Sequence, residues 1–409
     1  MQKTLTLLLT FLMLGALLIS CGKDASSGNM QPSPQPIEVP EPNDPIKDRI
    51  AEMSIDEKIG QMLLVGLEGT TVNSESRMLI EDKHIGGFIL YKDNMTDSSQ
   101  IAALLNELKD ANRVNKAPLW LSVDQEGGKV NRLPEQYAKL PTAEQIGRMN
   151  NSEYSFQIGA VIGEALHSLG FNMNFAPVLD INSNPLNPVI GNRAFGDTPQ
   201  RVIQHGMETM KGLQSKQVAA VVKHFPGHGD TSIDSHLDLP VVKKSISELE
   251  NFELLPFKEA IKQHTDAIMI AHLLIPKLDE KYPASLSKKI MTDLLRNTLQ
   301  YEGVIITDDM TMGGITEHFD IGEAAVRSVQ AGSDILLIGH DYDLQMTVIK
   351  ALKKSVDEGV LTEDMLNKSV YRILRLKEKY KLQDTPVNHV DVQAVNRQIE
   401  AALKLAKSK

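Results

Sequence analysis

Eight short apolar segments recur along the chain, and they constrain its fold more than any other feature. Most are rich in β-branched or aromatic residues, as strands are, and helix-length segments separate them. Strands that alternate with helices pair in parallel through right-handed crossovers. Eight such units predict an α/β fold of the (β/α)8 TIM-barrel type. The segments are QMLLVG (61–66), GGFILY (86–91), LWLSVD (119–124), FNMNFAPV (171–178), VAAVVKHF (218–225), DAIMIAHL (266–273), GVIITDD (303–309) and DILLIG (334–339).

An open, doubly wound sheet is the alternative fold. Its first strand-to-helix turn should carry the GxGxxG pattern, which the sequence lacks at that place. The sequence therefore favours one barrel domain, which we expect at residues 46–385, followed by a C-terminal helix at 386–409. Near its start, the stretch SIDE (54–57) has the pattern of a capping box and predicts a helix after it.

The first 45 residues have the features of a signal for export followed by a membrane anchor and a tether. Lys3 precedes an apolar run that is short for a spanning helix and ends at Cys21, the only cysteine. We expect a signal peptide at residues 1–20, and LISC resembles the lipobox of bacterial lipoproteins, in which the cysteine is lipidated. Residues 21–45 contain six prolines and predict a tether, either flexible or extended as polyproline II. The alternative is an ordinary signal peptide or membrane anchor with an incidental cysteine.

The formal net charge of −10 bears on the partners of the chain. An acidic protein is a poor match for nucleic acid and for anionic membrane surfaces as main partners. We therefore expect no nucleic acid partner, and membrane contact through a lipid anchor only.

Ionisable side chains stand where several of the apolar segments end. In a barrel, the carboxyl ends of the strands form the rim on which active sites are built, so this pattern indicates an enzyme. The residues are Asp124, Asp180, Lys223, His224, His272 and Asp308.

The stretch KHFPGHGDTSIDSH (223–236) suits a catalytic loop best among three hypotheses. In a zinc site His224 and His228 would share a helix face, but a proline and a glycine lie between them. A phosphate-binding loop would need its lysine at the other end. Asp234 and His236 are two residues apart, so their side chains point the same way in an extended segment, and a carboxylate beside an imidazole fixes its tautomer and stabilises its protonated form.

The same stretch closely resembles the signature of family 3 glycoside hydrolases, in particular the bacterial β-N-acetylglucosaminidases. Further matches occur in the expected order over about residues 50–380: EKIGQMLLVG, DQEGGKVNRL, FAPVLDI, IGNRAFG, MIAHLLIP, ASLS and VIITDDMTM. The resemblance implies that Asp308 is the nucleophile of a retaining mechanism. It also implies that His236 and Asp234 form the acid/base dyad, on a loop after the fifth strand.

The resemblance further implies which residues bind the sugar. Asp124, Arg193, Lys223 and His224 match positions that hold the non-reducing N-acetylglucosamine, and Arg132 and His272 match other pocket positions. Alternation along a strand puts Asp308 and Asp309 on opposite faces, and the resemblance selects Asp308 for the lumen. We expect Asp309 to be a structural hydrogen-bond acceptor and His228 to support its loop.

Together these features predict a monomeric, exo-acting, retaining β-N-acetylglucosaminidase. It would remove terminal N-acetylglucosamine from peptidoglycan fragments, without a metal or an organic cofactor, while lipid-anchored outside the cytoplasm. A β-glucosidase or an N-acetylglucosaminide phosphorylase is an alternative, because a histidine acid tolerates phosphate where a carboxylate would repel it. A catalytically inactive, glycan-binding lipoprotein is a third hypothesis.

Overall fold

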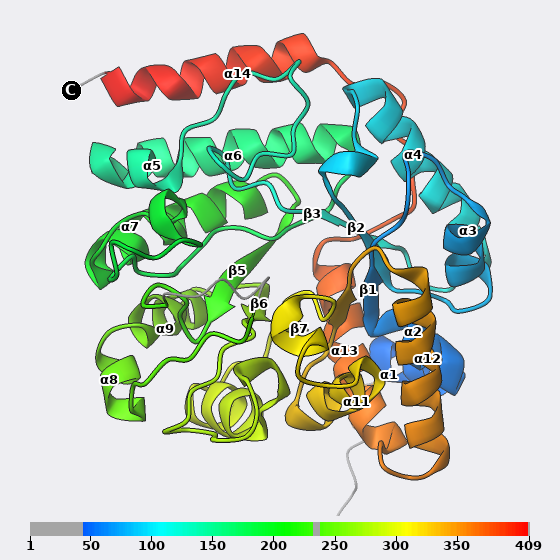
Figure 1. Ribbon diagram of the computed structural model, residues 1–409. Coiled ribbons are helices and arrows are strands. Elements are labelled where there is room, and N and C mark those ends of the chain that lie inside the picture. The colour runs from blue at the N-terminus through cyan, green and yellow to red at the C-terminus, as the bar shows by residue number, and fades with distance from the viewer. Residues whose placement is uncertain (1–43, 232–237, 408–409) are drawn as a thin grey trace, which may run out of the picture. The chain divides into compact units, whose positions relative to one another are not determined.

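The strands of the computed structural model form a closed parallel barrel (Figure 1). The structure describes residues 44–231 and 238–407. Strand order is β7-β6-β5-β4-β3-β2-β1-β8, and a parallel bridge between Ile306 and Ile335 joins β7 to β8. The predicted (β/α)8 fold is therefore confirmed, and every strand lies inside its predicted segment. The strands are β1 (Leu63–Val65), β2 (Gly87–Leu90), β3 (Trp120–Val123), β4 (Met173–Asn174), β5 (Ala219–Phe225), β6 (Ala267–Ile270), β7 (Val304–Thr307) and β8 (Leu336–Ile338).

The fourth strand is much shorter than the predicted segment 171–178. Regular pairing ends at Asn174, and the chain meets β5 again at an isolated bridge between Val178 and Lys223. Pro177 lies between these points and has no N–H to donate to a sheet. The proline therefore accounts for the early end of β4.

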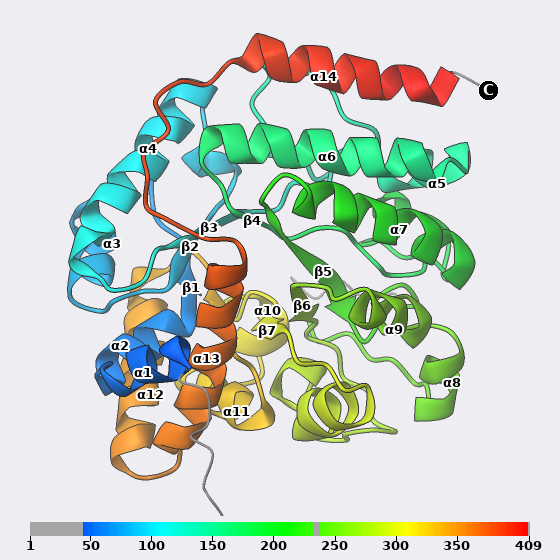
Figure 2. The same cartoon turned by 180° about the vertical axis from the view of Figure 1, so that it is seen from behind.

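Helices surround the barrel, as Figures 1 and 2 show from opposite sides. The α-helices are α1 (Pro45–Ala51), α2 (Ile55–Gln61), α3 (Ser74–Glu81), α4 (Ser98–Ala111), α5 (Ala143–Met149), α6 (Ser152–Leu169), α7 (Pro199–Gln214), α8 (Ile246–Asn251), α9 (Leu254–Lys262), α10 (Gly313–Thr316), α11 (Ile321–Ala331), α12 (Tyr342–Asp357), α13 (Glu363–Lys379) and α14 (Val392–Lys404). Short 3₁₀ turns are η1 (Lys92–Asn94), η2 (Asn112–Val114), η3 (Gly191–Arg193), η4 (Ala284–Leu286) and η6 (Leu405–Lys407), and η5 (Lys289–Thr298) is a π-helix.

The predicted capping box begins α2. The Glu57 amide donates to the Ser54 hydroxyl at 3.2 Å, and the Glu57 carboxylate accepts from the Ser54 amide at 2.7 Å. Two amides that the helix itself cannot pair are thereby satisfied.

All eight strands are buried along their whole length, because the lumen covers one face and the helices cover the other. Their carboxyl ends meet at one rim, which brings the polar residues after β3, β5 and β7 together. At the far end of the chain, α14 packs along α6 (Figures 1 and 2).

The signal peptide, Cys21 and most of the tether lie outside the described residues. In the part described, no helix is both long enough and apolar enough to cross a membrane.

Candidate active site

A network of ion pairs lies at the rim where β3 and β5 end. The Lys223 ammonium donates to Asp124 and lies 2.8 Å from Glu126 Oε1. The Arg193 guanidinium donates to both oxygens of Glu126, at 2.7 and 2.8 Å. A bidentate pair fixes orientation as well as distance. Four side chains from three separate parts of the sequence are thus held as one unit.

Burial makes this network electrostatically strong. The side chain of Lys223 is 3% exposed and that of Glu126 is 6% exposed. Burial alone would raise the pKa of Glu126, but the charges of Arg193 and Lys223 hold that pKa far below its usual value. Burial likewise works to lower the pKa of Lys223, yet Asp124 and Glu126 raise it above the ordinary value. Glu126, Lys223 and Arg193 are therefore charged at neutral pH and are held in fixed positions.

Asp180 holds the histidine next to Lys223. Its carboxylate lies 2.6 Å from His224 Nδ1 and accepts the backbone amide of His228 at 2.6 Å. Burial raises the pKa of Asp180, but the charges and hydrogen bonds of His224 and His228 together more than reverse this, and the pKa lies below its usual value. Within the described residues, no group of three or more His, Cys, Asp and Glu side chains is arranged to hold a metal ion.

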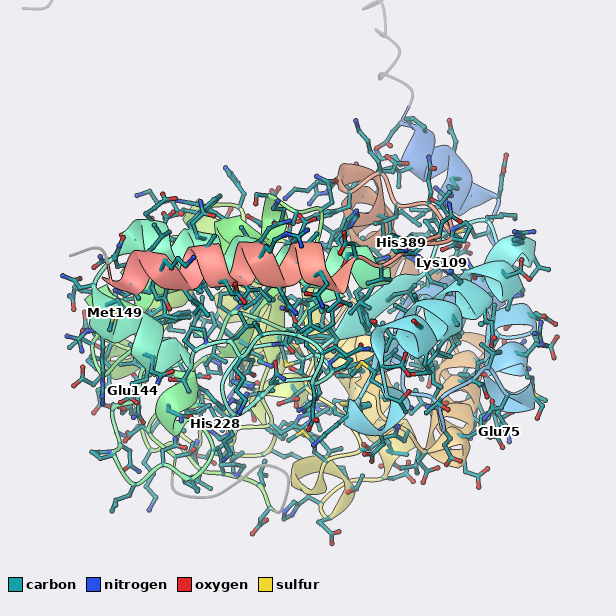
Figure 3. The ribbon with its side chains drawn as sticks, turned by 90° about the horizontal axis from the view of Figure 1, so that it is seen from above. Glu75, Lys109, Glu144, Met149, His228 and His389 are labelled. Atoms are coloured by element: carbon teal, nitrogen blue, oxygen red, sulfur yellow. The ribbon has the colours of Figure 1, made fainter. Side chains whose placement is uncertain are left out.

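The loop after β5 packs tightly against the chain that follows β4. A Cβ on Gly229 would lie 1.7 Å from the carbonyl oxygen of Ile181, and Gly227 has φ of +130°, so both positions require glycine. His228 (Figure 3) is buried, and its Nδ1 lies 2.7 Å from the Thr231 hydroxyl. These contacts confirm the prediction that His228 supports the loop.

The two aspartates after β7 have different surroundings. Asp309 accepts four hydrogen bonds: from the Thr311 amide and hydroxyl, the Gly339 amide and the Tyr91 hydroxyl, at 2.7 to 2.9 Å. The prediction that Asp309 is a structural acceptor is thus confirmed. Asp308 is half-buried, and its carboxylate accepts the Asp309 amide at 2.9 Å.

Tyr91 is a residue of this rim that sequence reasoning missed. It follows β2, its ring packs against His340 with centroids 4.1 Å apart, and burial together with Asp309 raises its pKa well above the ordinary value. The phenol is therefore neutral and donates to Asp309. Its position at the end of the apolar segment 86–91 is a usable signal, but a neutral phenol does not stand out among the ionisable carboxylates and cations at the other strand ends.

Glu126 was missed for a different reason. It lies within the quoted motif DQEGG, two residues after Asp124, and a carboxylate so near the strand end could have been noticed. Its partners could not have been identified from the sequence. Arg193 and Lys223 are 67 and 97 positions away, and only the fold brings them close to Glu126.

His272 and Arg132, the two less central pocket residues, occupy different places. The His272 ring is fully buried, with Nδ1 2.6 Å from the Ser285 hydroxyl and Nε2 2.9 Å from the Asp309 carbonyl. Both ring nitrogens are thus engaged by protein atoms, which makes His272 a support for the segment of Asp309. Arg132 is half-buried, and its Nε has no hydrogen-bond partner within the described residues.

The proposed acid/base pair, Asp234 and His236, lies outside the described residues. The structure therefore brings together Asp124, Arg193 and Lys223 in one network and places His224 beside it, next in the chain to Lys223.

Known proteins resemble this chain over most of its length. The family model "Glycosyl hydrolase family 3 N terminal domain" matches residues 54–376. Beta-hexosaminidase A of Pseudoalteromonas piscicida is 36% identical over 82% of this chain, which spans 61% of that protein's length. Beta-hexosaminidase of Thiobacillus denitrificans is 33% identical over 71% of this chain and 81% of its own.

A solved structure agrees with both relatives. The glycoside hydrolase family 3 β-N-acetylglucosaminidase from Paenibacillus sp. str. FPU-7 superposes with a TM-score of 0.81 at 38% identity, covering 87% of this chain and 69% of that one. Because the family model covers most of the barrel and the relatives match it throughout, the chain belongs to glycoside hydrolase family 3.

Proposed function

We propose that this chain is an exo-acting, retaining β-N-acetylglucosaminidase that acts on peptidoglycan-type glycans. The observation that carries the proposal is the buried network of Asp124, Glu126, Lys223 and Arg193 at the rim on which Asp308 stands. Fixed charged groups of both signs suit the hydroxyl groups of one terminal sugar, since each can make a charge-assisted hydrogen bond. The names of the relatives support N-acetylhexosamine as that sugar.

In the first step, the Asp308 carboxylate attacks the anomeric carbon of the bound sugar. The bond to the leaving oxygen breaks, and the protonated imidazole of His236 gives that oxygen its proton. The products of this step are the free leaving-group sugar and a glycosyl ester of Asp308. Asp234 stabilises the imidazolium that must be present at the start.

In the second step, a water molecule attacks the same carbon from the side that the leaving group vacated. Neutral His236 takes a proton from this water, the ester bond breaks, and the Asp308 carboxylate is regenerated. Two displacements at one carbon retain the β configuration. Neither step uses a metal ion or an organic cofactor.

A turnover assay with a chromogenic β-N-acetylglucosaminide tests this function. We expect release of free N-acetylglucosamine, formed first as the β anomer by proton NMR, and no sugar phosphate when inorganic phosphate is added. Sugar phosphate as the main product would make the chain a phosphorylase, and turnover only with the glucoside would make it a β-glucosidase. Absence of turnover together with glycan binding would identify an inactive lectin-like protein.

We place the protein outside the cytoplasm as a lipid-anchored monomer. The sequence around Cys21 supports this location, because a lipobox-like stretch precedes a proline-rich tether. Two or more acyl chains on the mature cysteine suffice for stable membrane attachment.

A further inference from the structure

Four cationic side chains form a stripe along α13. Lys368, Arg372, Arg375 and Lys379 follow one another at spacings of four, three and four residues. This spacing puts them on one face of a helix, over a length of about 16 Å. The stripe has no part in the rim chemistry described above.

Two neighbouring cavities open along this stripe. Their volumes are about 790 and 500 Å³, and both are lined by Tyr301, Arg372 and Arg375. Lys47 and Arg296 also line the larger one, which thus has five Lys or Arg residues in its wall against a single acidic residue, Glu302. The wall of the larger cavity is therefore strongly cationic in a chain of net charge −10.

Buried carboxylates neutralise only part of this charge. Asp334 pairs with both Arg296 and Arg372, and Lys379 lies 2.6 Å from the buried Asp266. The Arg375 guanidinium donates to a neutral carbonyl, that of Glu302, at 2.7 Å. Lys47, Lys368 and Arg375 are exposed. Lys368 lies 2.6 Å from the equally exposed Asp364, and an exposed pair of this kind is weak, so all three cations are accessible to a ligand at the surface.

The cationic surface lies at the end of the barrel opposite the active-site rim. Tyr301 and Glu302 come just before β7, whereas Asp308 comes just after it. The N-terminal segment joins the protein here as well: Asp44 begins the described chain, caps α1 and accepts a hydrogen bond from the Tyr371 hydroxyl in the cavity wall at 3.0 Å. Figure 2 shows α1 beside α13.

We propose that this surface, made by α13 with Lys47 and Arg296, docks the barrel onto an anionic phospholipid surface. The chain that leads from the proposed anchor at Cys21 enters the described residues at Asp44, beside this surface, and the cations of the surface complement the charge of lipid phosphates. A stripe about 16 Å long with two cavities suits several headgroups better than one small anion. The acidic net charge of the chain does not prevent this docking. Charges more than about 8–10 Å from the lipid are largely screened, so the cations of this surface determine its attraction to the lipid phosphates. Docking would leave the active-site rim facing the cell wall.

Vesicle partitioning tests the proposal without the anchor. The full-length Cys21→Ala protein carries no acyl chain, and its partition onto phosphatidylglycerol vesicles is compared with that onto phosphatidylcholine vesicles. We expect preference for the anionic vesicles and loss of that preference at high salt. The variant Lys47→Gln/Lys368→Gln/Arg375→Gln should lose on the order of a hundredfold in partition constant, since each cation near such a surface contributes severalfold.

A matched variant controls for total charge. Arg201→Gln/Lys211→Gln/Lys262→Gln removes three exposed cations from α7 and α9, and should keep the anionic preference. Equal loss in both triple variants, or no anionic preference of the starting protein, would overturn the proposal, as would binding of inorganic phosphate by calorimetry without vesicle binding. Turnover of the chromogenic substrate should be unchanged in all variants, so failure of docking and failure of the proposed enzyme activity are separately visible.

Discussion

At the scale of single residues, Glu126 shows how one carboxylate holds two sequence-distant cations in fixed positions at the rim. It receives Arg193 on two oxygens and Lys223 on one. Removing one partner from such a cluster leaves the others buried and uncompensated, which is costly. We therefore regard Glu126 as the positioning residue of the network.

The Glu126→Gln variant should lose acid sensitivity. The folded-state pKa of Glu126 is lowered, so its contribution to stability is present above the unfolded value near 4.5 and is lost as pH falls below it. Between pH 6 and pH 3, the free energy of unfolding of the wild type should fall by about 2 kcal/mol more than that of the variant. Urea unfolding at both pH values measures this.

Glu144→Gln is the control for this experiment. It removes a carboxylate from an exposed ion pair with Arg148 at the surface of α5 (Figure 3), and exposed pairs contribute little. If both variants change the pH dependence equally, the network around Glu126 is not the cause.

Asp308→Ala should reduce kcat by more than about a thousandfold and leave the fold intact, because the covalent step loses its nucleophile. A slowly hydrolysed substrate should leave its sugar on Asp308 in the wild type, as read by peptide mass spectrometry. Asp309→Ala is the matched variant. It should instead lower the melting temperature, since Asp309 accepts four hydrogen bonds. Sugar found on Asp309 would contradict the assignment.

His236→Ala should slow natural disaccharides far more than aryl glycosides with acidic phenols. A good leaving group departs without a proton, whereas a sugar needs one. Asp234→Ala should show the same pattern more mildly, because the imidazole remains but is less well oriented. An equal loss of kcat/KM on both classes of substrate would assign His236 to binding or to loop structure.

At the scale of elements, α13 closes the end of the barrel opposite the active site. Lys377 points from this helix to three acceptors: Gln61 Oε1 at 2.7 Å, the Gly86 carbonyl at 3.1 Å and the Pro118 carbonyl at 2.7 Å. The Lys377 amino group thus meets acceptors at the starts of β1, β2 and β3. A single side chain thereby ties one helix to three strands.

Lys377→Met should destabilise the protein by roughly 3 kcal/mol, because three buried acceptors lose their donor. Burial lowers the pKa of Lys377 to about 7, from 10.5 in the unfolded chain. The unfolded state therefore binds the extra proton between these values, and wild-type stability should rise by about 2 kcal/mol from pH 7 to pH 9 relative to the variant. Lys368→Met, at an exposed position of α13, is the control. An identical pH dependence in wild type and Lys377→Met would contradict this explanation.

At the scale of the whole molecule, the two ends of the barrel differ in their charged groups and in the roles we propose for them. The ionised rim lies at one end, and the cationic surface beside Asp44 lies at the other.

Cys21→Ala should release the protein from the membrane fraction of the producing cells without changing its kcat or KM. The proposed acyl chains would attach to this cysteine, which is unique in the chain. Fractionation followed by a high-salt wash measures the effect, because the wash also removes proteins held by charge alone. Retention of the variant after the wash would contradict the lipid anchor.

The sequence by itself determined the barrel and the positions of its strands. Periodicity is a local property, so segments such as 218–225 and 303–309 could be recognised without knowing their neighbours. The capping box of Ser54 and Glu57 and the different faces of Asp308 and Asp309 are local for the same reason. The motif around Lys223 and His224 indicated where the chemistry lies.

Only the tertiary structure decided which sequence-distant groups form ion pairs and hydrogen bonds with one another. Glu126 meets Arg193 and Lys223, Tyr91 meets Asp309, and Lys377 meets the starts of three strands. None of these pairs is close in sequence, and no local pattern specifies a partner. The same holds for the cationic surface: net charge sums over the whole chain, whereas a ligand meets only the charges within a Debye length of its own surface.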